Sequence, residues 1–206
     1  MIGTNQTRRL LRYRMGLMRL KKMGLQKVFS YTIGDETGVS AELVRKDFSQ
    51  LGIKGRRRGG YAIDELLKSL GKILGTGKVQ NVILVGLGNI GSAMAKYEGF
   101  KTNNMNLVAG FDIDPTKQNK KLDIPVYPME NIDEVIDAFD VSVAVLAVPE
   151  FSAQEVTSFL VEKGIRGILN FAPVLLRVPE NVWVNNINIM VELERLMYHV
   201  GLKERA

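Results

Sequence analysis

A glycine-rich loop at residues 86–91 has the spacing that can cradle phosphates. It follows Val82–Val85, an unbroken apolar run of the kind that buried parallel strands show. In such a loop the first glycine permits a tight turn, the second lets the backbone approach a pyrophosphate, and the third lets a helix pack closely on the strand. The start of that helix offers free N–H groups to the phosphates. The predicted phosphate site comprises Gly86, Gly88, Asn89, Ile90 and Gly91.

One acidic residue stands where a dinucleotide site needs a carboxylate. Asp112 follows a second apolar run, Leu107–Phe111, and lies 21 residues beyond Gly91, close to the separation of about 20 in dinucleotide-binding domains. Its carboxylate can accept hydrogen bonds from the adenosine ribose and would repel a 2′-phosphate. The spacing therefore favours NAD and NADH as ligands over their phosphorylated forms. The alternative is a glycine-rich turn in a domain that binds no ligand.

Two further segments are expected to line the nicotinamide end, because ligands of open α/β sheets lie beyond the carboxyl ends of the strands. Val148 and Pro149 follow a third apolar run, and Asn170 and Ala172 end the fourth. No side chain among them resembles a hydride-transfer acid. The remaining C-terminal stretch is too short for a substrate domain, and its candidate acids and bases are Tyr198, His199 and Lys203. The site is therefore expected to sense a cofactor and not to catalyse.

The segments that must hold these residues alternate between strand-like and helix-like patterns from residue 78 onward. Strands are expected near 82–85, 107–111, 141–148 and 167–171, and helices near 90–98, 131–139 and 152–163. This alternation predicts an α/β domain of Rossmann type, with a doubly wound parallel sheet and right-handed crossovers.

The first part of the chain has a different character. Residues 1–75 carry a net formal charge of +10, and residues 76–206 carry −4. Apolar residues recur at three- and four-residue steps over 10–23, which predicts an amphipathic helix ended by Gly24. Ser30 is expected to cap a second helix through Thr37, and Ser40 a third over 41–50. Two short helices around a glycine-containing turn predict a helix-turn-helix.

The third helix has the composition of a DNA-recognition helix. Its apolar residues Leu43, Val44 and Phe48 are expected to face the core. The opposite face would then present to solvent Arg45, Lys46 and Ser49.

A basic segment with glycines on both sides follows, and it contains Arg57 and Arg58. After a helix-turn-helix, it indicates a hairpin or wing whose arginines enter a DNA minor groove. The alternative is a solvated loop.

Several classes of protein are disfavoured by composition. The chain has no cysteine and a single histidine, so disulfides, thiolate chemistry and a zinc site are not expected. No apolar run approaches the length of a membrane span. Arginines at positions 8, 9, 12 and 14 interrupt any signal peptide. We therefore expect a cytoplasmic protein without a metal site.

The C-terminal stretch is expected to form an amphipathic helix with an unusually broad apolar face. Its apolar residues are Ile189, Met190, Leu193, Leu196, Met197 and Val200. Such a face is too broad for a lone surface helix. Periodicity alone leaves two interpretations open, since the helix can pack on its own sheet or on a second subunit.

Several strings of residues combine in a way that is more specific than the glycine loop. They are Val44–Ser49, Gly60-Tyr61, Gly86–Gly91, Lys96–Phe100, Phe111–Asp114, Val148-Pro149, Gly164–Pro173 and Val191–Leu193. Through them the chain resembles, along nearly its whole length, the Rex family of bacterial redox-sensing transcriptional repressors.

The resemblance implies a homodimer with C-terminal helices exchanged between subunits and winged-helix domains bound to a palindromic double-stranded operator. It further implies that NAD permits binding and that NADH releases the repressor. We therefore divide the chain into a DNA-binding domain at 1–77, an NAD(H)-binding domain at 78–187 and a dimerisation helix at 188–206. The rival hypotheses are a small NAD-dependent oxidoreductase with a basic extension and an RNA- or membrane-associated NAD protein.

The resemblance also implies a switch formed by Arg14, Tyr97 and an aspartate after the last strand. This chain carries Asn188 in place of that aspartate, and an amide can hydrogen-bond but cannot form a salt bridge. Two other departures lie in the predicted DNA-binding domain. Arg58 replaces a glycine of the wing, and Gln50-Leu51 replaces an aromatic pair.

Overall fold

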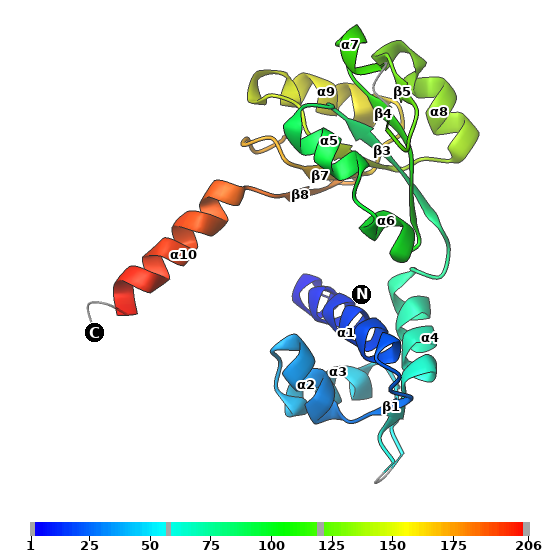
Figure 1. Ribbon diagram of the computed structural model, residues 1–206, viewed down its shortest axis with the longest axis vertical. Helices are drawn as coiled ribbons and strands as arrows, with labels where there is room; N and C mark the ends of the chain where they lie inside the picture. Colours follow the sequence, from blue (N-terminus) through cyan, green and yellow to red (C-terminus); the bar gives the residue numbers. More distant parts are fainter. Residues whose placement is uncertain (1–2, 57–58, 119–121, 204–206) are drawn as a thin grey trace. The chain divides into compact units, whose positions relative to one another are not determined.

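The computed structural model describes residues 3–56, 59–118 and 122–203 (Figure 1). By its contacts the chain divides into two compact units, Met1–Lys78 and Val79–Ala206. Within the described ranges, no helix is both long enough and apolar enough to cross a membrane.

The N-terminal unit is mainly helical. Its elements are α1 (Thr4–Lys22), β1 (Lys27–Val28), α2 (Ser30–Thr37), α3 (Ala41–Gln50), β2 (Tyr61–Ala62) and α4 (Ile63–Leu74). The two short strands pair antiparallel, and Arg56 bridges to Gly60 within the loop that β2 closes. One apolar core joins the helices, and its largest fully buried side chains include Leu10, Tyr13, Leu17, Ile33, Phe48 and Leu66.

The predicted helices of this unit are present, with shifted ends. α1 begins at Thr4, earlier than the apolar pattern shows, because its first turns are polar and the pattern starts at Leu10. The expected cap at Ser30 is wrong: Phe29 is the N-cap, and Ser30 is the first helical residue. The cap at Ser40 is confirmed, since its hydroxyl oxygen accepts a hydrogen bond from the Leu43 N–H at 3.3 Å.

The second unit contains one six-stranded sheet. Its strands are β3 (Gln80–Val85), β4 (Met105–Phe111), β5 (Val126–Tyr127), β6 (Val143–Leu146), β7 (Gly167–Asn170) and β8 (Trp183–Asn186). All pairs are parallel, in the order β5-β4-β3-β6-β7-β8. The order reverses between β3 and β6, as it does in doubly wound dinucleotide-binding sheets. The predicted Rossmann-type sheet is confirmed.

The residues of β3 alternate between two cores, one on each face of the sheet. Ile83 and Val85 pack with residues of α8 (Ile132–Phe139) and α9 (Glu150–Glu162). Val82 and Leu84 pack with residues of α5 (Asn89–Ala95) and, after it, with Phe100 of α6 (Gly99–Thr102). Burial on both faces explains why this strand is apolar without interruption.

The shorter elements differ from the sequence expectations. The expected strand at 141–148 extends only over Val143–Leu146, because the Val141 N–H instead closes the end of α8 by donating to Ile136 O. The expected helix at 90–98 ends at Ala95, where two tight turns follow. β5 has two residues, and β8 is an edge strand with mostly exposed residues, so neither has a strong apolar pattern.

The remaining elements of this unit are α7 (Pro115–Gln118), the 3₁₀ turn η1 (Met129–Asn131) and the C-terminal helix α10 (Ile189–Lys203). In the single chain the apolar residues of α10 are exposed. Ile189, Leu193, Leu196 and Val200 retain between 46% and 61% of their accessible surface. The chain therefore leaves this apolar face of α10 without an intramolecular cover.

Candidate functional site

The three glycines of the loop after β3 differ in whether the fold requires them. Gly86 has φ +91, and a Cβ there would lie 2.5 Å from Ala147 O. A Cβ on Gly91 would lie 1.8 Å from Gly86 O, so the helix could not approach the loop with any side chain there. Gly88 is different: its φ is −65, and nothing lies within 4 Å of its Cβ direction. The fold itself therefore does not require a glycine at position 88. A ligand that approaches the backbone closely would require one, because a side chain would block it.

A cavity of about 730 Å³ lies against this loop at the carboxyl ends of β3, β4 and β6. This position is the point where the strand order reverses, at which doubly wound sheets bind dinucleotides. The cavity is lined by seven of the ten residues predicted for the cofactor, namely Gly86, Gly88, Asn89, Ile90, Asp112, Val148 and Pro149. Its size and position fit a dinucleotide.

The other three predicted cofactor residues do not line this cavity. Gly91 is required by the backbone contact described above. Asn170 is fully buried, and its amide donates to Val174 O and Asn186 Oδ1, both at 2.8 Å. Its Oδ1 accepts from the Ala172 N–H at 2.9 Å, and Ala172 is buried. In the single chain, Asn170 therefore holds the end of β7 in place and offers no polar atom to the cavity.

Asp112 is buried under the glycine loop, with 6% of its surface exposed. Its Oδ2 accepts a hydrogen bond from the Leu87 N–H at 2.6 Å, and its Oδ1 accepts one from the Asp114 N–H at 2.9 Å. The carboxylate thus orders the glycine loop and also faces the cavity. Its third partner is Lys117, which was not predicted from the sequence and whose Nζ lies 3.3 Å from Oδ2. The sequence signal for this pair is a lysine five residues beyond the aspartate. In the structure, both residues line the same cavity.

The face of α3 that was predicted to meet DNA is exposed. Arg45, Lys46 and Ser49 all point to solvent, and Val44 and Phe48 on the other face are buried. Leu43, expected in the core, is only half-buried. The α3 helix therefore presents a polar, cationic surface.

Two hydrogen bonds hold the exposed Arg45 side chain in place. Its guanidinium donates to Ser30 Oγ at 2.9 Å and to Glu42 Oε1 at 3.0 Å. Ser30 begins α2, so this contact links the two helices on either side of the turn at Gly38. The cation is presented in a defined position.

Behind that surface, α3 is tied to α1 by a buried carboxylate. Asp47 is 1% exposed and accepts hydrogen bonds from Arg9 Nε and Nη2, both at 2.7 Å, and from Tyr13 OH at 2.9 Å. Burial alone would raise the pKa of Asp47, but the hydrogen bonds from Arg9 and Tyr13 and the Arg9 charge bring it below the usual value. Burial and the bond to Asp47 raise the pKa of Tyr13. This buried polar group was not predicted from the sequence.

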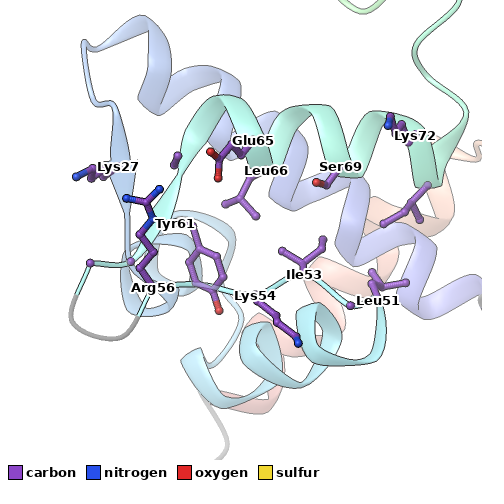
Figure 2. A pocket seen from close by; sticks show the side chains of 15 residues that line it. Lys27, Leu51, Ile53, Lys54, Arg56, Tyr61, Glu65, Leu66, Ser69 and Lys72 are labelled. Carbon is purple, nitrogen blue, oxygen red and sulfur yellow. The ribbon is translucent and has the colours of Figure 1, made fainter.

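A second cavity, of about 430 Å³, lies in the N-terminal unit between α4 and the segment that follows α3 (Figure 2). Figure 2 shows apolar side chains from α4 and that segment, including Leu66 and Ile53. Cationic side chains of Lys27, Lys54, Arg56 and Lys72 also line it. The predicted wing residues Arg57 and Arg58 lie outside the described residues.

The three predicted switch residues lie on separate elements. Arg14 is half-buried on α1. Tyr97 follows α5, is 62% exposed and contacts the Phe100 ring edge to face, with centroids 5.9 Å apart. Asn188 has a role that the sequence did not reveal: its Oδ1 accepts hydrogen bonds from the N–H groups of Met190 and Val191, at 3.0 and 3.2 Å. It caps the start of α10.

Within the part of the chain that the structure describes, no cluster of three or more His, Cys, Asp or Glu residues could hold a metal ion. The two candidate sites that the observations above support are the cavity beside Gly88 and the exposed face of α3.

Family models match both parts of the chain. Residues 78–174 match the family described as “CoA binding domain”. Residues 2–49 match the family described as “Putative DNA-binding protein N-terminus”. The first match falls on the unit that contains the cavity beside Gly88, and the second falls on the unit that contains α3.

Relatives with the name “Redox-sensing transcriptional repressor Rex” match nearly the whole chain. The protein from Desulforamulus reducens is 38% identical over 198 residues, which cover 96% of this chain and 94% of the relative. The protein from Pelotomaculum thermopropionicum is 40% identical over 197 residues, which cover 95% of this chain and 92% of the relative.

Solved structures of RSP, a Rex-family repressor, are also similar. RSP in complex with β-NAD+ and operator DNA matches with a TM-score of 0.89 and 33% identity, covering 99% of this chain and 94% of RSP. RSP in complex with β-NADH matches with a TM-score of 0.85 and 33% identity, covering 99% and 96%. The chain belongs to the Rex family of redox-sensing transcriptional repressors, which are regulators and not enzymes.

Proposed function

We propose that the protein is a transcriptional repressor that responds to the NADH/NAD ratio. It binds a palindromic operator when NAD or no ligand is bound, and NADH releases it. The observation that carries the proposal is the open approach to the backbone at Gly88, beside a cavity that also contains Asp112. The RSP structures support it, because that relative was solved with β-NADH and with β-NAD+ and operator DNA.

In this proposal the pyrophosphate lies over Gly88, where the fold leaves room for it. Asn89 and Ile90 flank the phosphates, and Asp112 binds the adenosine ribose. Val148 and Pro149, after β6, line the nicotinamide half. Gly86 and Gly91 shape the loop, and the bond between Asn170 and Ala172 fixes the chain at the end of β7.

Operator binding is assigned to the N-terminal unit as a winged helix-turn-helix. The helix α3 lies in the major groove, with base or phosphate contacts from Arg45, Lys46 and Ser49. The linkage of Arg45 to Ser30 and Glu42 supports this assignment, because a preorganised donor loses less entropy on binding. Arg57 and Arg58 enter the adjacent minor groove from the wing.

The active form in this proposal is a homodimer. The exposed apolar residues of α10 need a cover, and a second copy with exchanged helices supplies one. A twofold dimer also matches the twofold symmetry of a palindromic operator. The domain limits are then 1–77 for DNA binding, 78–187 for NAD(H) and 188–206 for dimerisation. Since the partner is chromosomal DNA of a bacterium, we place the protein in the cytoplasm.

The switch in this proposal joins Arg14 and Tyr97 to Asn188 of the partner subunit. NADH can release DNA only by binding the DNA-incompetent state more tightly than the competent one. Allosteric coupling of this kind is typically about 1–3 kcal/mol. A neutral amide at residue 188 makes the contact weaker than a carboxylate would, because charge-assisted hydrogen bonds are stronger than neutral ones.

A gel-shift titration with the DNA upstream of the protein's own gene tests the proposal. We expect retardation of the DNA without ligand and with NAD, and release with NADH. The Arg45→Ala, Arg57→Ala double variant should bind the same DNA far more weakly. Steady hydride transfer with any substrate from a panel of alcohols and keto acids would favour an oxidoreductase instead, and unchanged operator affinity in the double variant would refute the winged-helix assignment.

A further inference from the structure

The charge of Asp112 in the cofactor cavity is already matched by a cation from the same chain. Lys117 Nζ lies 3.3 Å from Asp112 Oδ2, and the two side chains are 29% and 6% exposed. With the N–H groups of Leu87 and Asp114, the buried carboxylate has three donors. An ionised carboxylate offers about four acceptor positions, so most of its capacity is used before any ligand binds.

The lysine belongs to the wall of the same cavity. It lies in α7, directly after the loop that carries Asp112 and Asp114, and it lines the cavity together with them. Its partial exposure means that the ammonium group is accessible from the cavity side. Because lysine is a point charge on a flexible stem, it can leave one acceptor for another nearby.

This arrangement changes the expected treatment of a 2′-phosphate. A lone buried carboxylate would repel the phosphate strongly, since few counter-charges screen it. Here the ammonium group offsets that charge and can itself form a charge-assisted hydrogen bond to a phosphate oxygen. The two side chains therefore act in opposite directions on a phosphorylated dinucleotide.

We propose that Lys117 is a specificity-determining residue that moderates the exclusion of NADP(H) by Asp112. The inference rests on the proposed function, because it assigns the ribose end of the cofactor to the cavity beside Asp112. NADH, which has no 2′-phosphate, gains little from the ammonium group. The natural protein binds NADPH weakly, and most of that affinity comes from Lys117.

Calorimetric titration of the full-length protein with NADH and with NADPH tests this inference. In Lys117→Met, we expect the dissociation constant for NADPH to rise by about tenfold and that for NADH to change by less than about twofold. Lys117→Arg keeps the positive charge, so its ratio of NADH to NADPH affinity should stay close to that of the natural protein. The matched control is Lys163→Met, since Lys163 also pairs with an aspartate, Asp133 at 2.5 Å, but does not line this cavity.

A thermal melt of each variant shows whether it folds. If Lys117→Met does not fold, the NADPH affinities of Lys117→Gln and Lys117→Arg are compared instead, and the inference requires weaker NADPH binding in Lys117→Gln. An NADH/NADPH affinity ratio that is equal in all variants would overturn the role of Lys117 and leave the proposed function intact. Tighter NADPH binding in Lys117→Met would overturn it as well. If the natural protein binds neither dinucleotide, the proposed function itself fails, and this inference fails with it.

Discussion

Arg9 holds Asp47 in a bidentate contact that joins α1 to α3, with its Nε and Nη2 each 2.7 Å from a carboxylate oxygen. The Asp47 side chain is 1% exposed, and Arg9 is 25% exposed. The next residues along α3 toward the N-terminus are the cationic pair Arg45 and Lys46. The contact therefore sets the rotation of α3, and with it the direction of the side chains proposed to meet DNA.

Asp47→Asn should destabilise the N-terminal unit by about 3 kcal/mol, because it leaves Arg9 with a neutral partner in a buried site. Urea unfolding followed by circular dichroism measures this change. Asp64→Asn is the control, since Asp64 pairs with Lys21 at 2.6 Å but is 75% exposed. It should change stability by less than about 1 kcal/mol. Equal effects of the two substitutions would contradict the assigned role of Asp47.

The contribution of Asp47 should disappear in acid. Its folded pKa is lower than its unfolded pKa, so its stabilising effect is complete above about pH 4 and is lost as the pH falls through the folded value. The difference in unfolding free energy between the natural protein and Asp47→Asn should be constant from pH 7 to about 5 and shrink below about 4. Urea titrations at a series of pH values measure it. A difference in unfolding free energy that does not shrink at all below about pH 4 would show that the Asp47 carboxylate is not its source.

Gly88→Val and Gly91→Ala should separate binding from folding. Gly88 has a negative φ and open space at its Cβ direction, so Gly88→Val should melt close to the natural protein and lose NADH affinity by about a hundredfold or more. Gly91→Ala places a Cβ 1.8 Å from Gly86 O and should destabilise the second unit itself. Calorimetry and thermal melts give both quantities. Full NADH affinity in Gly88→Val would show that the pyrophosphate does not bind at this loop.

Truncation after Asn188 should abolish dimerisation. It removes the exposed apolar face of α10, including Leu193 and Leu196, at 46% and 60% exposure. We expect a monomer in sedimentation velocity, or an insoluble protein if the surface left behind is also apolar. A well-folded dimer of the truncated protein would refute the proposed interface.

Asn188→Asp should sharpen the response to redox state. Both residues can cap α10 through a side-chain oxygen, so stability should change by less than about 1 kcal/mol. The added charge strengthens the proposed contact with Arg14, and the ratio of operator affinities with saturating NAD and saturating NADH should increase. Asn188→Ser keeps a cap without a charge and should not raise that ratio. If Asp and Ser give the same ratio as Asn, residue 188 does not tune the switch.

The sequence alone determined the features that depend on local pattern. The apolar run before Gly86, the glycine spacing and Asp112 predicted a dinucleotide-type sheet, and the sheet has the corresponding strand order. The capping of α3 by Ser40 was also readable, because it depends on residues three positions apart. Such features can be recognised because strand and helix periods place neighbouring residues in fixed relations.

The tertiary structure decided what depends on residues far apart in the chain. The contact of Asp47 with Arg9 spans 38 positions. Asp47 lies on the buried face of α3 with Val44 and Phe48, and no local pattern shows which distant residue is its partner. Likewise, Asn170 was expected to line the cofactor cavity, but its side chain is buried and its amide instead donates to Asn186 across β7 and β8. Such pairings arise because a buried polar group must find a hydrogen-bond partner wherever the fold brings one near, and this requirement has no periodicity in the sequence.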